Sequence, residues 1–116
     1  MKIADLYIRV STIEQAEKGY SQCNQYYHLK NYCEINNIEI RKVIFEIHSG
    51  KTFNRPEWEK FLIPIKKEPG TAGLLLFTKW DRFSRNKREA EQMIKVLRQF
   101  GVEPKTITQP LNSEIE

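Results

Sequence analysis

A run of four large apolar residues, Leu74–Phe77, constrains this chain more than any other stretch. A turn-like segment with proline and glycine, 68–73, precedes it, and polar residues follow from Thr78 onward. A strand without a single polar residue is typical of the centre of a parallel sheet, where helices cover both faces. We therefore expect a fold built around this strand, with polar loops at the ends of the sheet.

The rest of the chain alternates between strand-like and helix-like segments. Runs of β-branched and apolar residues indicate four strands, at residues 2–10, 39–47, 74–77 and 102–108. The last is expected at an edge of the sheet, because Pro104 cannot donate a hydrogen bond to a neighbouring strand. Segments with helical spacing lie between the strands, at 21–36, from 54–56 onward, and from 86 to 100.

Local sequence signals indicate where the three predicted helices begin and end. Pro56 suits the first turn of the second helix, and Pro64 either kinks that helix or ends it. Asn86 followed by Glu89 resembles a capping box at the start of the third helix, which Gly101 is placed to terminate. The first helix is expected to bury a side formed by Cys23, Tyr26, Tyr27, Leu29, Cys33 and Ile35. Its two cysteines are about 15 Å apart on one helix, too far for a disulfide, and are expected to be buried free thiols.

These patterns predict an α/β fold with a mostly parallel sheet. We expect a three-layer sandwich of four to five strands with helices on both faces. A length of 116 residues and a hydrophobic fraction of 40% suit a single domain over residues 1–116. The net charge of +4 favours a polyanionic partner only modestly. The start of the chain does not resemble a signal peptide, and no apolar run reaches about 18 residues, so a cytoplasmic protein without a membrane segment is expected.

Three polar loops are expected to meet at one edge of this sheet. Ligands of parallel α/β sheets bind outside the carboxyl ends of the strands, and the loops after the first three strands begin there. Together they contribute one serine at the end of the first strand and several cations and polar groups, namely Arg9, Ser11, Gln15, His48, Ser49, Lys51, Arg55, Lys79, Asp81, Arg82 and Arg85. Arg9 and Ser11 lie two apart on an extended segment and therefore share one face.

The residue types at this edge favour phosphoryl transfer. A serine hydroxyl is a weak nucleophile that usually needs a histidine held by an acid. His48 is at the right edge, but the chain has no Gly-x-Ser-x-Gly elbow, and His28 lies within a helix. Arginine is abundant instead, and guanidinium groups bind phosphate oxygens bidentately and stabilise a phosphorane-like transition state. A serine with arginines, no acidic cluster for metals and no nucleotide-binding loop suggests metal-free phosphoryl transfer to Ser11.

The chain carries three motifs in order, Y-I-R-V-S-T-x-x-Q (7–15), S-G-K-T-x-x-R-P-E (49–57) and K-W-D-R-F-S-R-N (79–86). This combination resembles the catalytic domain of serine site-specific recombinases, the resolvase/invertase family, over nearly the whole chain. The resemblance implies that Ser11 attacks a DNA phosphodiester, forms a 5′-phosphoserine link and releases a 3′-hydroxyl. Subunit rotation and religation follow, without metal, ATP or other cofactor. The family's remaining site positions match Arg9, Arg55, Arg82, Arg85, Gln15, Ser49 and Asp81. The implied partners are DNA, a homodimer and a tetramer in the synaptic complex.

Some features set this chain apart from many members of that family. Trp80 and Phe83 stand where many members have leucines, an exchange of one apolar residue for another. The stretch Gly19–Ser21 is more similar to the large or transposon-borne recombinases than to the small resolvases. The family continues into a long interface helix and a C-terminal DNA-binding domain, so residues 1–116 are expected to be a fragment that lacks both.

Several assignments stay open at this stage. Asp81 is either a catalytic carboxylate or a group that orients the arginines, and Ser49 either contacts substrate or is a turn residue before Gly50. Trp80 is either a packing residue or a surface on which a base stacks. Two other functions remain for the chain: a regulatory or accessory phosphate-binding α/β module with an inert Ser11, and a hydrolase that uses the histidine of the second loop.

Overall fold

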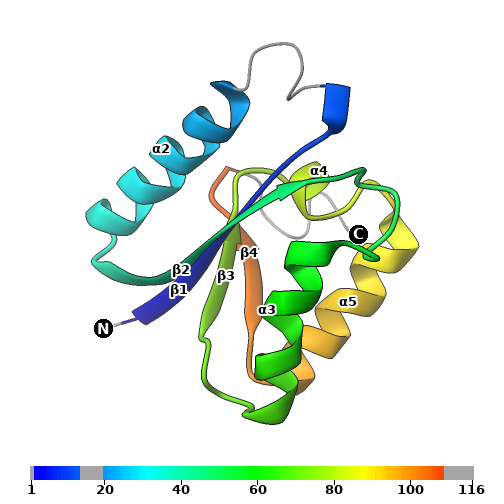
Figure 1. Cartoon of the computed structure of the whole chain (residues 1–116). Coiled ribbons are helices and arrows are strands. Elements are labelled where there is room, and N and C mark those ends of the chain that lie inside the picture. Colours follow the sequence, from blue (N-terminus) through cyan, green and yellow to red (C-terminus); the bar gives the residue numbers. More distant parts are fainter. Residues whose placement is uncertain (1, 14–19, 109–116) are drawn as a thin grey trace.

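A computed structural model describes residues 2–13 and 20–108, in which strands and helices alternate as predicted (Figure 1). The elements are, in order, β1 (Lys2–Val10), α2 (Tyr20–Ile35), β2 (Ile38–Ile47), α3 (Pro56–Lys67), β3 (Leu74–Phe77), α4 (Trp80–Phe83), α5 (Lys87–Gln99) and β4 (Glu103–Thr106). Pro64 does not end α3, which continues to Lys67. Over the described ranges, no helix combines the length and apolarity needed to cross a membrane.

The four strands of this part of the chain form one sheet in the order β2-β1-β3-β4. Each neighbouring pair is parallel, which confirms the predicted α/β sheet. β3 lies inside the sheet, as its apolar sequence predicts, and β4 with Pro104 lies at an edge. Figure 1 shows the three layers, with α2 on one side of the sheet and α3 and α5 on the other.

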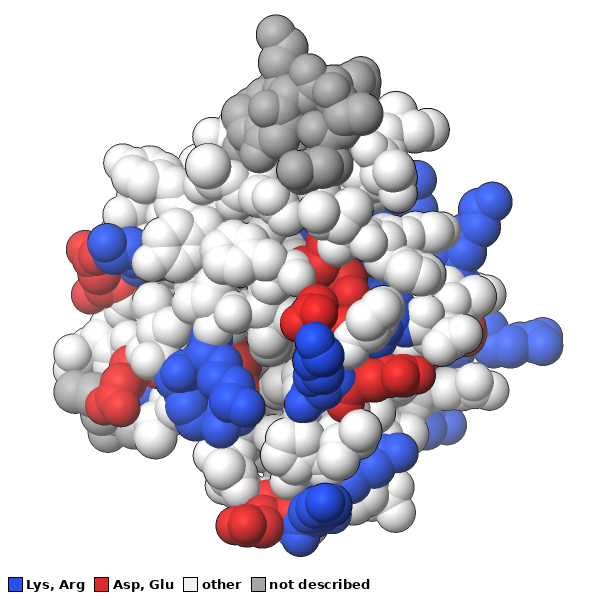
Figure 2. Space-filling view, viewed as in Figure 1, with Lys and Arg blue, Asp and Glu red and all other residues white. Residues whose placement is uncertain are grey.

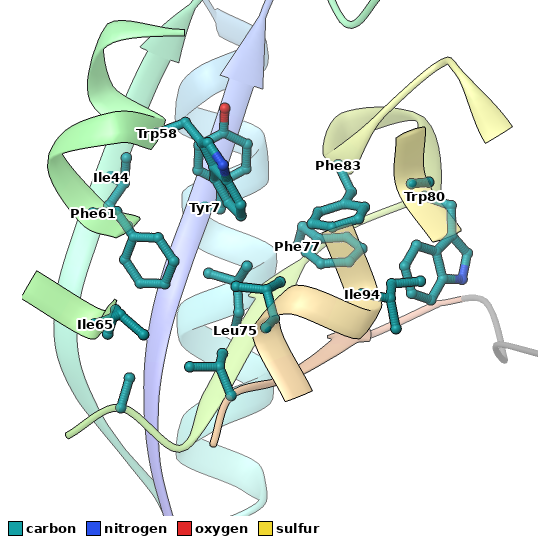
Figure 3. Close-up of a cluster of buried hydrophobic side chains, with 14 residues drawn as sticks. Tyr7, Ile44, Trp58, Phe61, Ile65, Leu75, Phe77, Trp80, Phe83 and Ile94 are labelled. Carbon is teal, nitrogen blue, oxygen red and sulfur yellow. The ribbon is translucent and has the colours of Figure 1, made fainter. Parts of the chain in front are cut away.

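Alternation along β1 divides the core into two parts. One set of β1 side chains packs with residues of α2 and consists of Ala4, Leu6 and Ile8. Tyr7 belongs to the other set and joins the larger cluster beneath α3 and α5 (Figure 3). Because side chains two apart share a face, Arg9 lies on the same side of the strand as Tyr7. The sheet therefore presents this arginine to the segments that follow β2 and β3.

The segment after β3 is not the polar loop that residues 78–85 were expected to form. Trp80–Phe83 is one turn of helix, and its two aromatic ends are buried. Phe77 stacks on Phe83 with ring centroids 4.9 Å apart and meets Trp80 edge-on at 5.0 Å (Figure 3). Residues three apart share one face of a helix, so both aromatics reach the core while Asp81 between them stays exposed. Of the two roles left open for Trp80, the structure therefore supports packing.

α5 begins with half of the predicted capping box. Asn86 Oδ1 accepts a hydrogen bond from Glu89 N at 3.2 Å, which confirms the cap. In a full box, the Glu89 side chain would bind Asn86 N. That amide instead donates to Ser84 Oγ at 3.0 Å, so the serine before the helix replaces the glutamate.

α2 buries a narrower strip than predicted. Leu29 and Cys33 are buried. The exposed members of the expected set are Cys23, Tyr27 and Ile35, so the prediction of two buried thiols was wrong. Gln25, which was not expected inside, is 5% exposed. Beside this strip, a cavity of about 550 Å³ lies between α2 and the ends of β3 and β4.

A buried ion pair lies between β1 and β2. The register of these strands shifts between Ala4 and Asp5, which leaves Arg41 as an extra residue of β2. The Arg41 guanidinium donates to both carboxylate oxygens of the fully buried Asp5, at 2.6 and 3.1 Å. Burial raises the pKa of Asp5 above its ordinary value, because lost hydration outweighs the attraction of Arg41.

Replacing Asp5 by asparagine tests this assignment through the pH dependence of stability. An acid whose pKa is raised in the folded state stabilises the fold most below its unfolded pKa, about 3.8, and that contribution is lost as the pH rises. The melting temperature of the wild type should therefore fall relative to that of Asp5→Asn between about pH 3 and pH 7. A relative rise of the wild type over this range would mean that Arg41 outweighs burial.

Candidate active site

The segments after β1, β2 and β3 meet at the carboxyl edge of the sheet, as predicted. His48 N donates to Val10 O at 2.9 Å, which joins the end of β1 to the loop after β2. Arg85 N donates to Gly50 O at 2.9 Å, which joins that loop to the segment after α4. Side chains from all three segments therefore surround one small region.

Arg9 links these segments from inside. Its side chain is fully buried. Nη1 donates to His48 O at 2.7 Å, and Nη2 donates to Asp81 O at 2.6 Å. Nε donates to Arg82 O at 3.0 Å. A planar guanidinium with five N–H donors is suited to binding several carbonyls at once, and here one such group from β1 binds the loop after β2 and α4 together.

The other three predicted arginines lie close enough to Arg9 to repel its charge. The pKa of Arg9 is lowered to about 10, first by burial and then by the charges of Arg55, Arg82 and Arg85. Arg9 still carries its proton at neutral pH. The site therefore concentrates positive charge whose mutual repulsion a bound anion would relieve.

Arg55 is also fully buried and holds the start of α3. Its Nε donates to Thr52 O at 2.7 Å, and its Nη1 donates to the Tyr7 hydroxyl at 3.0 Å. The guanidinium carbon lies 4.4 Å from the centre of the Phe53 ring, a cation–π contact. Because Arg55 immediately precedes α3, these contacts fix the entry into that helix.

Tyr7 and Glu46 complete this network, and the sequence interpretation missed both. The Tyr7 hydroxyl, whose pKa is raised by burial, donates to Glu46 Oε1 at 3.0 Å. The Glu46 carboxylate also accepts from Glu57 N at 3.0 Å and Trp58 N at 2.8 Å. Glu46 thus caps α3 from β2, at the helix end where negative charge is favoured. A usable signal existed, because Glu46 lies two residues after Ile44 and shares its buried face.

Most of the other predicted residues lie nearer the surface of the site. Ser11 and Arg82 are half-buried, and Asp81 and Arg85 are exposed. Arg82 Nη1 donates to the backbone carbonyl of the buried Arg9, with a separation of 3.3 Å. The amide predicted at position 15, Gln15, lies outside the described residues.

The loop after β2 makes turn contacts at its surface. Ser49 is exposed, and its Oγ accepts a hydrogen bond from Lys51 N at 3.1 Å. This is the local bond expected of a turn residue. His48 Nδ1 lies 3.0 Å from Ser49 O.

The arginines of the site are of two kinds. Arg9 and Arg55 are buried and donate to acceptors of the protein itself. Arg82 and Arg85 lie nearer to solvent, where guanidinium groups can take phosphate oxygens. Such an arrangement suits attack by the Ser11 hydroxyl on a phosphate held by cations. Within 2–13 and 20–108, no three His, Cys, Asp or Glu side chains are grouped so as to hold a metal ion.

On one face outside the site, the surface charge is mixed. Figure 2 shows the face that carries α3 and α5, where basic and acidic side chains lie side by side. A face of mixed sign does not attract a polyanion strongly. This face therefore does not provide a basic surface for an anion.

This chain is similar to one protein family and to several individual proteins. The family model for the resolvase N-terminal domain matches residues 4–115. A curated relative, the uncharacterized immunity region protein 3 of Bacillus phage phi105, is 40% identical over 67 residues, which are 57% of this chain and 82% of that protein.

Solved structures of recombinases share the fold. The N-terminal catalytic domain of TP901-1 integrase matches with a TM-score of 0.81 and 26% identity, over 91% of this chain and 78% of that chain. A serine recombinase from Sulfolobus solfataricus matches with a TM-score of 0.71 and 26% identity, over 94% of this chain and 71% of that chain.

Gly50 offers a test of the Arg9 contacts, because it leaves no room for a side chain. A Cβ at this position would lie 2.7 Å from Arg9 Nη2 and 2.9 Å from Arg9 Cζ. Gly50→Ala should displace the guanidinium and lower the free energy of unfolding by about 1–3 kcal/mol, measured by urea denaturation. The exposed neighbour Lys51 serves as control, with Lys51→Ala expected within about 0.5 kcal/mol of wild type. Equal stability of the two variants would contradict the assigned role of Arg9.

Proposed function

The chain belongs to the resolvase family as an N-terminal domain, a recombinase catalytic domain with DNA as its substrate, and we propose that Ser11 is its nucleophile. The Ser11 Oγ attacks the phosphorus of a DNA phosphodiester and loses its proton. The bond from phosphorus to the 3′-oxygen breaks, and that oxygen leaves as a 3′-hydroxyl. The product is a 5′-phosphoserine link, which a 3′-hydroxyl attacks in the reverse direction to rejoin the strand.

The observation that carries this proposal is the gathering of four arginines at the strand end that leads into Ser11. Arg82 and Arg85 bind the non-bridging phosphate oxygens and stabilise the charge that develops in the transition state. Arg9 and Arg55 do not contact the phosphate in this proposal. They fix the surrounding loops through their hydrogen bonds to backbone carbonyls. Energy of the phosphodiester is retained in the covalent link, so the cycle needs no nucleotide cofactor and no metal.

The remaining predicted residues have supporting roles in this proposal. Asp81 orients Arg9 through its main-chain carbonyl, which accepts a hydrogen bond from Arg9 Nη2. Ser49 shapes the loop after β2. Gln15 stays a predicted site residue. The protein acts in the cytoplasm as a homodimer and forms a tetramer when two DNA sites are brought together, which sedimentation with and without DNA would measure.

One observation favours a second function. The side chains of Arg9 and Arg55 donate to acceptors of the protein itself, and Arg82 and Arg85 are the more accessible arginines of the site. Two accessible guanidinium groups are enough to bind a phosphate without reaction. In that case the domain is an accessory phosphate-binding module, and Ser11 is inert.

Replacement of Ser11 separates these functions. The complete gene product is incubated with a nicked DNA substrate that carries its recombination site, identified beforehand by selection from genomic fragments, and is then denatured. Mass spectrometry should find a nucleotide linked through phosphate to Ser11 in the wild type and none in Ser11→Ala. DNA affinity of the variant should stay within about twofold, because the serine is proposed to act in the chemical step rather than in binding.

His48→Ala is the matched control, since Arg9 binds only the backbone carbonyl of His48. This variant should form the same adduct. DNA binding without any adduct at Ser11 would support the accessory module. Strand cleavage that disappears in His48→Ala but persists in Ser11→Ala would support the hydrolase.

A further inference from the structure

The backbone carbonyl of Arg9, two residues before Ser11, accepts hydrogen bonds from two side chains. Gln25 Nε2 of α2 donates to it at 3.0 Å, and Arg82 Nη1 donates to it at 3.3 Å. We propose that Gln25 is a positioning residue, which fixes the end of β1 and thereby the location of the Ser11 hydroxyl. The inference rests on the proposed function of Ser11.

The burial of Gln25 is unusual for its residue type and position. Gln25, Leu29 and Cys33 are spaced four apart and form the buried strip of α2. Leu29 and Cys33 pack against the aliphatic side chains of β1. At the third position, nearest the carboxyl edge, an amide replaces an apolar side chain. A buried amide is retained at little cost only where it forms hydrogen bonds, and here its Nε2 donates to the last part of β1.

The surroundings of α2 make this bond more important than an ordinary side-chain contact. The cavity of about 550 Å³ lies between α2 and the ends of β3 and β4, and both Gln25 and Arg82 line it. Below the cavity, Leu29 and Cys33 of α2 pack with apolar side chains of β1 and β3. At its rim, the hydrogen bond from Gln25 to Arg9 O ties the helix to the end of β1.

Gln25 and Arg82 differ in what happens when DNA binds. Arg82 both holds the Arg9 carbonyl and is proposed to contact phosphate. As the charge on the phosphate grows in the transition state, Arg82 shifts its donors toward it, because charge-assisted bonds to phosphate are the stronger ones. Gln25 is not proposed to contact phosphate. Its bond therefore continues to hold the Arg9 peptide, with Ser11 beyond it, when Arg82 turns toward the DNA.

The expected consequence is a defect in chemistry rather than in binding. A displacement of about 1 Å at a reacting group lowers rates by roughly 100-fold. Gln25→Met keeps the volume but removes the donor. At saturating DNA, the complete gene product with this change should form the Ser11 adduct about 10- to 100-fold more slowly, with its DNA dissociation constant within about twofold of wild type. Gln25→Glu, which puts an acceptor in place of the donor, should be at least as slow.

Amide hydrogen exchange measures the positioning itself. Loss of the bond should speed exchange over residues 10–12, which follow the Arg9 carbonyl, and leave Leu29 and Cys33 in α2 protected. The matched control is Gln22→Met, the same change three residues earlier on α2 at a half-buried position, which should alter neither exchange nor rate.

A normal cleavage rate in folded Gln25→Met and Gln25→Glu would overturn the inference. So would a slow rate with unchanged exchange over residues 10–12, or the same loss in Gln22→Met. If Gln25→Met unfolds, Gln25→Glu decides by the same two measurements. Failure of the proposed function looks different, because the wild type itself then forms no adduct at Ser11. The exchange measurement still reports on the Gln25 bond in that event.

Discussion

A buried arginine with main-chain carbonyls as its partners is the interaction on which the rest of the site depends. Arg9 extends from the end of β1 and donates to His48 O, Asp81 O and Arg82 O. A hydrogen bond to a charged group contributes about 1.5–3 kcal/mol, so three such bonds offset much of the hydration that the buried cation loses. These bonds hold the loop after β2 and the turn of α4 against the strand that leads into the serine. Gly50 permits this arrangement, because its missing side chain leaves space for the guanidinium.

The same arrangement concentrates positive charge. Arg9 experiences repulsion from Arg55, Arg82 and Arg85, and its own partners are neutral carbonyls. The Glu46 carboxylate is turned instead toward Tyr7 and the first amides of α3. A phosphate at this edge supplies negative charge that the described part of the chain does not place beside Arg9. Local charge therefore explains the attraction of a DNA backbone better than the modest net charge of +4.

Local patterns predicted most of the fold, and long-range contacts account for what they missed. The apolar run Leu74–Phe77 identified the interior strand because the signal lies within four residues. The turn of α4 was missed because one turn is too short to show a period, and the core that buries Trp80 and Phe83 comes from distant residues. In the site, the residue types were predicted but their division into buried and accessible was not. The burial of Glu46 follows from its spacing to Ile44, but its partner Tyr7 and the partner of Gln25, the Arg9 carbonyl, lie far along the chain, where no local spacing reveals them.

We infer that Arg9 organises the site and does not bind the phosphate, because its donors already serve three main-chain carbonyls. The most direct measurement is NMR of the arginine Nε–Hε groups in the ¹⁵N-labelled protein, with and without DNA. We predict an Arg9 signal that exchanges slowly with water and keeps its chemical shift when DNA is added, while the signal of Arg85 shifts. A rapidly exchanging Arg9 signal that shifts with DNA as Arg85 does would contradict the account, because it would show a solvent-accessible arginine that binds substrate.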